Sequence, residues 1–106
     1  IPKATQLQKL ENKSLVSYIY VGPPKDERKF GEEPRIQVND VFITPTEIPQ
    51  FVAQERAKLD ESERDKIIIS LKADQKAKMG IITDIKLQLR EADARKLNYA
   101  TVLDAN

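Results

Sequence analysis

Ile67-Ile-Ile-Ser-Leu71 is the stretch that decides the fold of this chain, because it is an almost unbroken apolar run. A run of this kind is expected for a β-strand that is buried on both faces. Residues 73–78 are predicted to form the loop after it, with a helix from Met79 or Gly80 to about residue 94. That helix is indicated by apolar residues that repeat at intervals of three and four, namely Ile82, Ile85, Leu89 and Ala92.

Strands are predicted on both sides of this unit. Residues 15–21 are rich in β-branched and aromatic side chains and stop at Gly22 and two prolines, which favours a strand with a clear end. Residues 35–38 and 41–43 flank Asn39-Asp40, two residues that tolerate a positive φ, and this pattern indicates a β-hairpin. Residues 98–103 are predicted to be the last strand.

A first helix is predicted to begin at Thr44-Pro45-Thr46-Glu47, which supplies a threonine cap and an early acid, with Pro49 in the first turn. It should run to about residue 59 and bury one face, made of Ile48, Phe51, Val52, Ala53, Ala57 and Leu59. The charged residues 25–33 are predicted to be an exposed excursion rather than an element, and residues 60–66 a charged connection.

The element order is therefore strand, hairpin, helix, strand, helix, strand. It predicts an α+β fold, a small mixed β-sheet with two α-helices on one face, because strand–helix–strand crossovers are right-handed. The other face then has no helix to cover it. That face, or an edge of the sheet, is a candidate for contact with another protein through Tyr18, Tyr20, Tyr99 and Val102. Tyr18 and Tyr20 share a face because they are two residues apart; the alternative is that both pack under the helices or across a neighbouring strand.

Composition limits the possible functions. The 106 residues include 18 basic and 17 acidic side chains, a balance that argues against nucleic-acid binding. The chain has no cysteine and no histidine, which excludes disulfides, thiolate zinc sites and catalysis by Cys or His. With 40% apolar residues, the composition is typical of a single globular domain, and we expect a protein that is not an enzyme and uses no cofactor or metal.

Asp74 is the strongest single candidate for a ligand-binding residue, because it stands just beyond the carboxyl end of the predicted buried strand, where ligand groups often lie in α/β folds. The alternative is that Asp74 caps the loop by accepting backbone N–H bonds. A small enzyme built around Asp74 would need a histidine, a cysteine or a second well-placed acid, and none accompanies it. The acids in residues 60–65 lack the glycine and the spacing of a calcium loop, which favours a solvated surface loop.

The second half of the chain carries motifs in a characteristic order: Ile67-Ile-Ile-Ser-Leu-Lys-Ala-Asp74, Met79-Gly80, Ile81-Ile-Thr-Asp-Ile-Lys86 with Leu89-Arg-Glu-Ala92, and Leu97-Asn-Tyr-Ala-Thr101. Together these segments resemble the ExbD/TolR family, whose pattern is a strand ending in Ala-Asp, a loop closing on aromatic-Gly, a helix, and a last strand ending near Ala-Thr. Upstream, Ile36-Gln-Val-Asn-Asp40 and Thr46-Glu47 resemble the hairpin and the first helix of that family. The resemblance covers about residues 14–103, with departures at Met79, at Asp93-Ala-Arg95 and in the long excursion of residues 22–34.

The resemblance implies that residues 15–106 are the periplasmic domain of a single-pass inner-membrane protein, and that residues 1–14 are the linker after a transmembrane helix that this chain does not contain. Such proteins form homodimers, pair with an ExbB- or TolQ-like channel and use the proton-motive force to energise a TonB- or TolA-like partner in TonB-dependent transport. The aspartate that carries the proton in the family belongs to the transmembrane helix, so no residue of this chain takes that role. The ExbD branch is favoured; the alternative is a TolR-like module that anchors to peptidoglycan or the envelope in a Tol-Pal type system.

The expected mechanism is the capture of an extended partner peptide by strand addition to an open sheet edge. Residues 15–21 or 98–103 are the predicted edges, and one of them also serves a homodimer. The predicted interface residues are Tyr18, Tyr20, Tyr99, Thr101 and Leu103. An RNA-binding α/β sandwich is a further alternative, against which the neutral charge and the lack of a basic-aromatic strand motif both argue.

Overall fold

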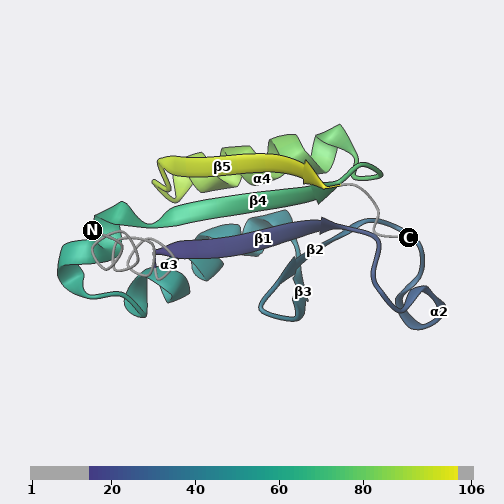
Figure 1. Cartoon of the computed structure of the whole chain (residues 1–106), viewed down its shortest axis with the longest axis horizontal. Coiled ribbons are helices and arrows are strands. Elements are labelled where there is room, and N and C mark those ends of the chain that lie inside the picture. Colours follow the sequence, from purple (N-terminus) through teal and green to yellow (C-terminus); the bar gives the residue numbers. More distant parts are fainter. Residues whose placement is uncertain (1–14, 103–106) are drawn as a thin grey trace, which may run out of the picture.

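A computed structural model describes residues 15–102, which form a five-stranded sheet with the order β3-β2-β1-β4-β5 (Figure 1). β1 pairs in parallel with β4, and β4 pairs in parallel with β5, whereas the β1–β2 and β2–β3 pairs are antiparallel. The predicted α+β fold with a mixed sheet is confirmed. The strands are β1 (Val16–Gly22), β2 (Arg35–Val38), β3 (Val41–Ile43), β4 (Ile68–Asp74) and β5 (Lys96–Val102).

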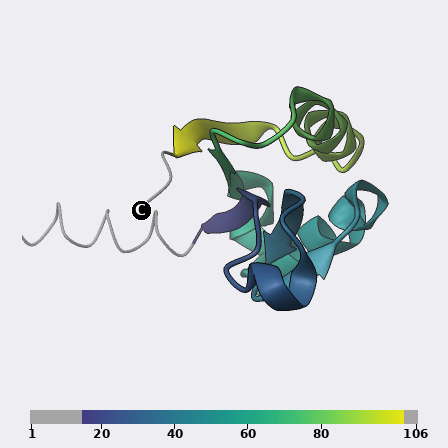
Figure 2. The same cartoon turned by 90° about the vertical axis from the view of Figure 1, so that its right-hand side faces the viewer.

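The two main helices, α3 (Ile48–Ala57) and α4 (Met79–Glu91), lie on the same side of the sheet, as Figure 2 shows in the view along the strands. α3 connects β3 to β4, and α4 connects β4 to β5. The other helical segments are short: α2 (Glu27–Phe30) and two 3₁₀ segments, η1 (Pro45–Glu47) and η2 (Glu61–Lys66). The prediction of two helices on one face is therefore confirmed.

The hydrophobic core lies between the helices and the sheet. Successive side chains of a strand point to opposite faces, so every second residue of β1 and β4 faces the helices. The fully buried strand residues follow this alternation and are Ile19, Val21, Ile69 and Leu71. On the helices, the residues with the greatest burial are Ile48, Phe51, Val52, Ile82, Ile85 and Leu89, which include most of the predicted stripes.

β4 differs from its prediction in two respects. It is not buried on both faces, because Ile68 and Ser70 are half-buried and Lys72 is exposed on the face that the helices leave open. It also continues to Asp74, so Ala73 and Asp74 belong to the strand and not to the loop. The physical reason is that Lys72 and Ala73 extend the alternation, with the long cation outward and the small apolar side chain in the core.

The buried face of α3 was predicted only in part. Ala53 and Ala57 are exposed, whereas Glu55 and Arg56 are half-buried in their place. An exposed alanine costs little, and both charged side chains gain hydrogen bonds to other elements, as described below. The sequence pattern counts alanine as apolar and Glu and Arg as polar. It therefore predicts that the two alanines, and not the two charged residues, lie on the buried side of this helix.

The prediction that residues 25–33 contain no element is wrong, although the segment is exposed as expected. α2 forms there because Oδ1 of Asp26 accepts a hydrogen bond from the backbone N–H of Lys29 at 3.1 Å, a capping contact. The rings of Phe30 and Phe42 meet edge to face with centroids 5.1 Å apart, and this contact attaches the excursion to β3. The connection of residues 60–66 likewise contains a 3₁₀ segment, η2.

The β2–β3 hairpin is confirmed. Asn39 and Asp40 have φ values of 47° and 64°, the positive pair that a two-residue turn of the type I′ family requires. The turn sets the register, in which Val38 pairs with Val41. Just after the hairpin, Glu47 accepts a hydrogen bond from the backbone N–H of Thr44 at 2.9 Å, which begins the helical segment where the sequence predicts it.

Candidate functional site

β1 is not an edge strand, so the prediction that residues 15–21 form a free sheet edge is wrong. β1 lies between β2 and β4, and Tyr20 to Gly22 pair with β2. The prediction assumed that the first strand along the chain would end the sheet. The hairpin instead folds back against β1 after the excursion of residues 23–34, so that β2 runs antiparallel to β1.

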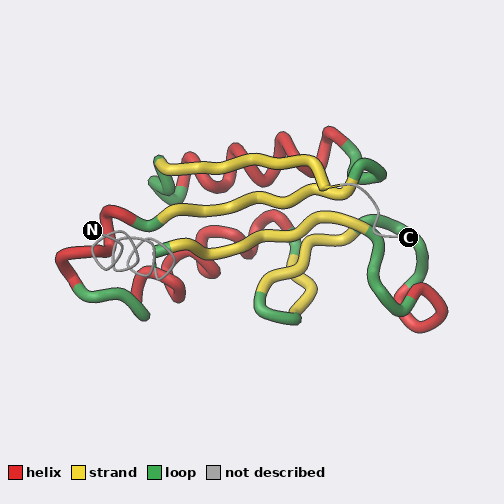
Figure 3. The backbone as a smooth tube through the Cα atoms, viewed as in Figure 1, coloured by secondary structure: helices red, strands yellow, loops and turns green. Residues whose placement is uncertain are grey.

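Only the second half of β1 has this neighbour. The β1–β2 register begins at Tyr20, so no described strand pairs with Val16 to Ile19 on the side of β1 that faces away from β4. Figure 3 shows the hairpin beside the C-terminal half of β1. A notch of about 290 Å³ occupies the space, and its lining includes the acids Asp40 and Glu55. The notch is therefore an opening beside β1, separate from the two edges of the sheet, and the charged side chains that line it within the described part of the chain are both acids.

Within residues 15–102, the edge of β5 is the strongest candidate site for contact with another chain. The backbone N–H of Ile68 donates to the carbonyl oxygen of Leu15 at 2.9 Å, so the backbone groups of Ile68 face β1. Backbone groups alternate in direction along a strand, so those of Ile69 face β5, where Ile69 is paired with Leu97. In a parallel ladder a residue bonds to the two neighbours of its partner. The backbone groups of Leu97, Tyr99 and Thr101 therefore point outward along the edge.

The opposite edge, β3, offers much less. It has three residues, and its hairpin pairing directs the backbone groups of Val41 and Ile43 toward β2. Phe42 alone directs its groups outward. The prediction that the last strand is an edge agrees with the strand order, although β5 begins at Lys96 rather than at residue 98.

The predicted tyrosines do not form one patch. Tyr18 is 53% exposed on the open face, where Nζ of Lys72 lies 4.7 Å from the centroid of its ring. Tyr20 lies on the same face and is half-buried, with its hydroxyl over Gly22. Tyr99 aligns with Leu71, so it lies on the helix side of the sheet, at the β5 edge. Tyr18 and Tyr20 thus share the open face, whereas Tyr99 lies at a sheet edge, the other location predicted for these residues.

The remaining interface candidates divide between the edge and the end of the chain. Thr101 is exposed and shares the helix side of β5 with Tyr99. The ring of Tyr99 is covered in part by Lys86 of α4, whose Nζ lies 4.5 Å from the ring centroid. Leu103 lies outside the described residues, as do residues 1–14 of the predicted linker. The edge candidates within the described part are thus Tyr99 and Thr101.

A groove beside β5 was not predicted from the sequence. It has a volume of about 400 Å³ and lies between α4 and the start of β5. The Arg95 side chain is 84% exposed there, and a hydrogen bond from its Nε to Oδ1 of Asp93 at 2.8 Å raises the pKa of its guanidinium. The spacing of Lys86 and Arg90 places two cations on one side of the predicted helix, but the sequence carries no signal for the groove itself. The residues that line it are Lys86, Leu89, Arg90, Asp93, Ala94, Arg95 and Leu97.

Asp74 acts as a local cap in the structure. It is 7% exposed, and its Oδ1 accepts a hydrogen bond from the backbone N–H of Lys76 at 2.8 Å. Its carbonyl oxygen accepts another from the N–H of Ala77 at 2.9 Å. Both bonds close the turn between β4 and α4, which is the capping role expected as the alternative to a ligand role.

Glu55 forms a polar cluster that sequence reasoning missed. Its carboxylate, with the side chain 12% exposed, accepts hydrogen bonds from Oγ of Ser17 at 3.0 Å and from Nζ of Lys58 at 2.6 Å. Nδ2 of Asn39 also donates to it, at 3.4 Å. The cluster joins α3 to β1 and to the hairpin turn, and it explains why a carboxylate is tolerated at a half-buried position.

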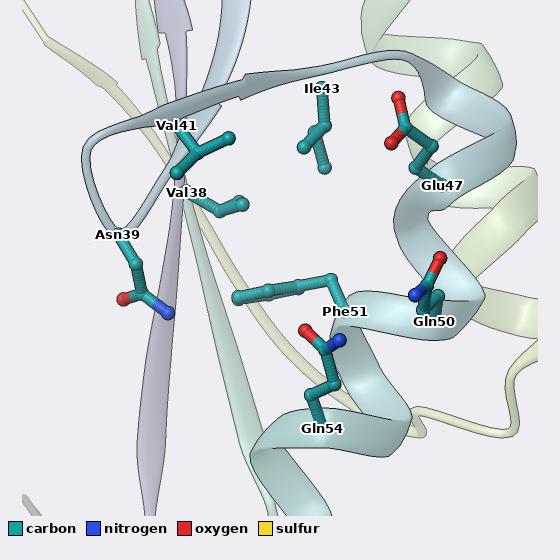
Figure 4. Close-up of a pocket in the computed structure, with 8 residues that line it drawn as sticks. All are labelled: Val38, Asn39, Val41, Ile43, Glu47, Gln50, Phe51 and Gln54. Atoms are coloured by element: carbon teal, nitrogen blue, oxygen red, sulfur yellow. The ribbon is translucent and has the colours of Figure 1, made fainter.

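A small pocket of about 220 Å³ opens between the β2–β3 hairpin and α3 (Figure 4). The ring of Phe51 and the side chains of Val38 and Ile43 border its apolar part. Gln50, Gln54, Asn39 and Glu47 border the polar part. Val41 completes the lining, and it is 57% exposed.

Residues 15–102 contain no cluster of three or more acidic, cysteine or histidine side chains that could hold a metal ion. None of the helices in the same range is long and apolar enough to cross a membrane. Comparison with known proteins gave no match to a family model, to a curated protein or to a solved structure.

Proposed function

We propose that the chain is a non-enzymatic periplasmic subunit of the ExbD/TolR type, which couples an ExbB- or TolQ-like channel to a TonB- or TolA-like partner. The proposal places this domain outside an inner membrane, where it captures an extended segment of the partner and transmits motion from the channel. Sequence motifs and fold support it together: the Ala-Asp strand end closes β4, and the motif around Tyr99 lies in β5.

One observation carries the mechanism. The β5 edge is seven residues long and directs the backbone groups of Leu97, Tyr99 and Thr101 outward. An extended peptide satisfies such groups by adding a strand to the sheet. The β3 edge lacks the length for this, because it has three residues. β5 is therefore the edge at which the partner segment is proposed to pair.

The test is a titration of the nitrogen-15-labelled 106-residue chain with synthetic peptides that tile the periplasmic linker of the TonB-like protein from the same organism. Strand addition should shift the amide resonances of Leu97, Tyr99 and Thr101 most. Shifts centred on β3, or no shifts at millimolar peptide, would contradict capture at β5. Sedimentation with purified cell wall separates the proposal from the wall-anchoring alternative, since only the latter predicts that the domain pellets.

A further inference from the structure

Cations outnumber acids among the charged side chains that line the groove beside β5. Lys86 and Arg90 stand one helical turn apart on α4, and Arg95 stands just before β5. Among residues 15–102, Asp93 is the only acid that lines the groove, and its Oδ1 is already bound to Nε of Arg95 at 2.8 Å. Because the whole chain has a formal charge of +1, this local excess of cations is a feature of the groove and not of the average surface.

We propose that this groove selects an acidic partner segment: an extended peptide that pairs with β5 and places carboxylates on Lys86 and Arg90. The inference rests on the proposed function, because it specifies the chemistry of the segment captured at the same edge. Carboxylates are the natural partners of ammonium and guanidinium groups. Leu89, Ala94 and Leu97 supply an apolar floor between the cations.

The spacing of the two cations fits an added strand. Residues four apart on a helix are separated by about 6 Å along its axis. Every second residue of a strand points to the same face, and such residues are about 6.6 Å apart. Two acids at positions i and i+2 of the captured segment would therefore face α4 together and reach Lys86 and Arg90 in turn.

The other openings do not suit an acidic segment. The notch beside β1 is lined by Asp40 and by Glu55, which is already paired with Lys58, and the described residues of its lining include no cation that a carboxylate could bind. The pocket between the hairpin and α3 contains one ionisable side chain, Glu47, and lies at the short β3 edge. Charge therefore selects β5 over both alternatives.

The experiment compares two synthetic peptides of equal length, one of alternating Glu and Thr and one of alternating Gln and Thr. Binding to the full chain is followed by the amide shifts of Leu97, Tyr99 and Thr101. The Glu peptide is expected to bind about two- to tenfold more tightly at low salt, and the difference should shrink as salt screens the charges. The double variant Lys86→Gln, Arg90→Gln should remove most of that difference.

A matched control removes the same charge elsewhere. Lys25→Gln with Arg28→Gln alters two exposed cations of the distant excursion and should leave the preference for the Glu peptide unchanged. Equal binding of the two peptides at β5, or an equal loss in the control variant, would overturn the acidic preference while strand capture itself stands. If neither these peptides nor the linker peptides of the TonB-like protein shift β5, both the inference and the proposed mechanism are overturned.

Discussion

Arg56, in the last turn of α3, donates a hydrogen bond from Nη1 to the carbonyl oxygen of Ala92 at 2.8 Å, and its Nη2 donates to the carbonyl oxygen of Asp93 at the same distance. The carbonyl groups at the end of a helix have no partner within the helix, and they carry the negative end of its dipole. One guanidinium on α3 thus completes the end of α4 and joins the two helices.

Replacement of Arg56 by methionine should therefore destabilise the fold by about 1–3 kcal/mol, since it leaves two carbonyl groups without their charged donor. Urea unfolding measures the loss. Arg28→Met is the matched control, because Arg28 is exposed on α2, and it should change the free energy of unfolding by less than about 0.5 kcal/mol. Equal effects of the two variants would show that the bonds from Arg56 contribute nothing to stability.

The position of Gly22 at the end of β1 has no room for a side chain. A Cβ atom there would lie 2.5 Å from the hydroxyl of Tyr20 and 2.8 Å from Cβ of Asp74. Gly22→Ala should lower the stability by about 1–3 kcal/mol, because Cβ of Asp74 cannot move without the backbone. Gly80→Ala is the control: Gly80 has open space around its Cβ position and lies in α4, so alanine there should be neutral or stabilising by up to about 1 kcal/mol. Thermal unfolding of both variants checks the contrast.

The two faces of β1 predict opposite outcomes for neighbouring residues. Ile19 is fully buried under the helices, so Ile19→Ala should cost about 2–5 kcal/mol. Tyr18 is 53% exposed on the other face, so Tyr18→Ala should cost less than about 1 kcal/mol. Chemical denaturation of the pair measures both values, and a larger loss for Tyr18 would mean that its face is covered.

Asp74 should matter to the turn through its acceptor oxygen and not through its charge. Asn retains an oxygen for the N–H of Lys76, so Asp74→Asn should be close to neutral. Asp74→Ala should cost about 0.5–2 kcal/mol, as the loss of a capping acceptor usually does. Hydrogen exchange at the Lys76 amide, together with urea unfolding, separates the two variants. Equal losses for Asn and Ala would reject a purely local capping role.

Proline scanning of β5 tests the direction of its backbone groups. The N–H of Thr101 points outward, so Thr101→Pro should leave the β4–β5 ladder intact and weaken peptide capture. The N–H of Ala100 points toward β4, so Ala100→Pro removes a ladder bond and should cost at least about 1 kcal/mol more in stability. Peptide titration and thermal unfolding of both variants provide the check. A larger loss of stability for Thr101→Pro than for Ala100→Pro would mean that the N–H of Thr101, and not that of Ala100, points toward β4.

Much of the fold follows from local signals. The positive-φ pair Asn39-Asp40 determines the hairpin and its register, and the repeat of Ile82, Ile85 and Leu89 determines the buried side of α4. The strand order was not predictable in the same way, because the partner of β1 depends on how the hairpin folds back. The error at α3 has a similar origin: Arg56 is half-buried because of acceptors at Ala92 and Asp93, which lie more than thirty residues away.

The candidate site was predictable only in outline. The last strand was expected to be an edge, and it is one. The side of the sheet on which Tyr99 lies was not predictable, because it depends on a register with Leu71 that the sequence does not contain. The groove was missed for the same reason, since Lys86, Arg95 and Leu97 meet only after α4 packs beside β5.

The direction of the strands has a mechanical consequence. β1, β4 and β5 all run the same way, so the start of β1 and the end of β5 lie at opposite ends of the sheet. Tension applied between these two points acts along the strands and loads the rungs of both parallel ladders in shear, so that they must break together and not one after another. Such a sheet resists stretching far better than one that is pulled apart like a zipper.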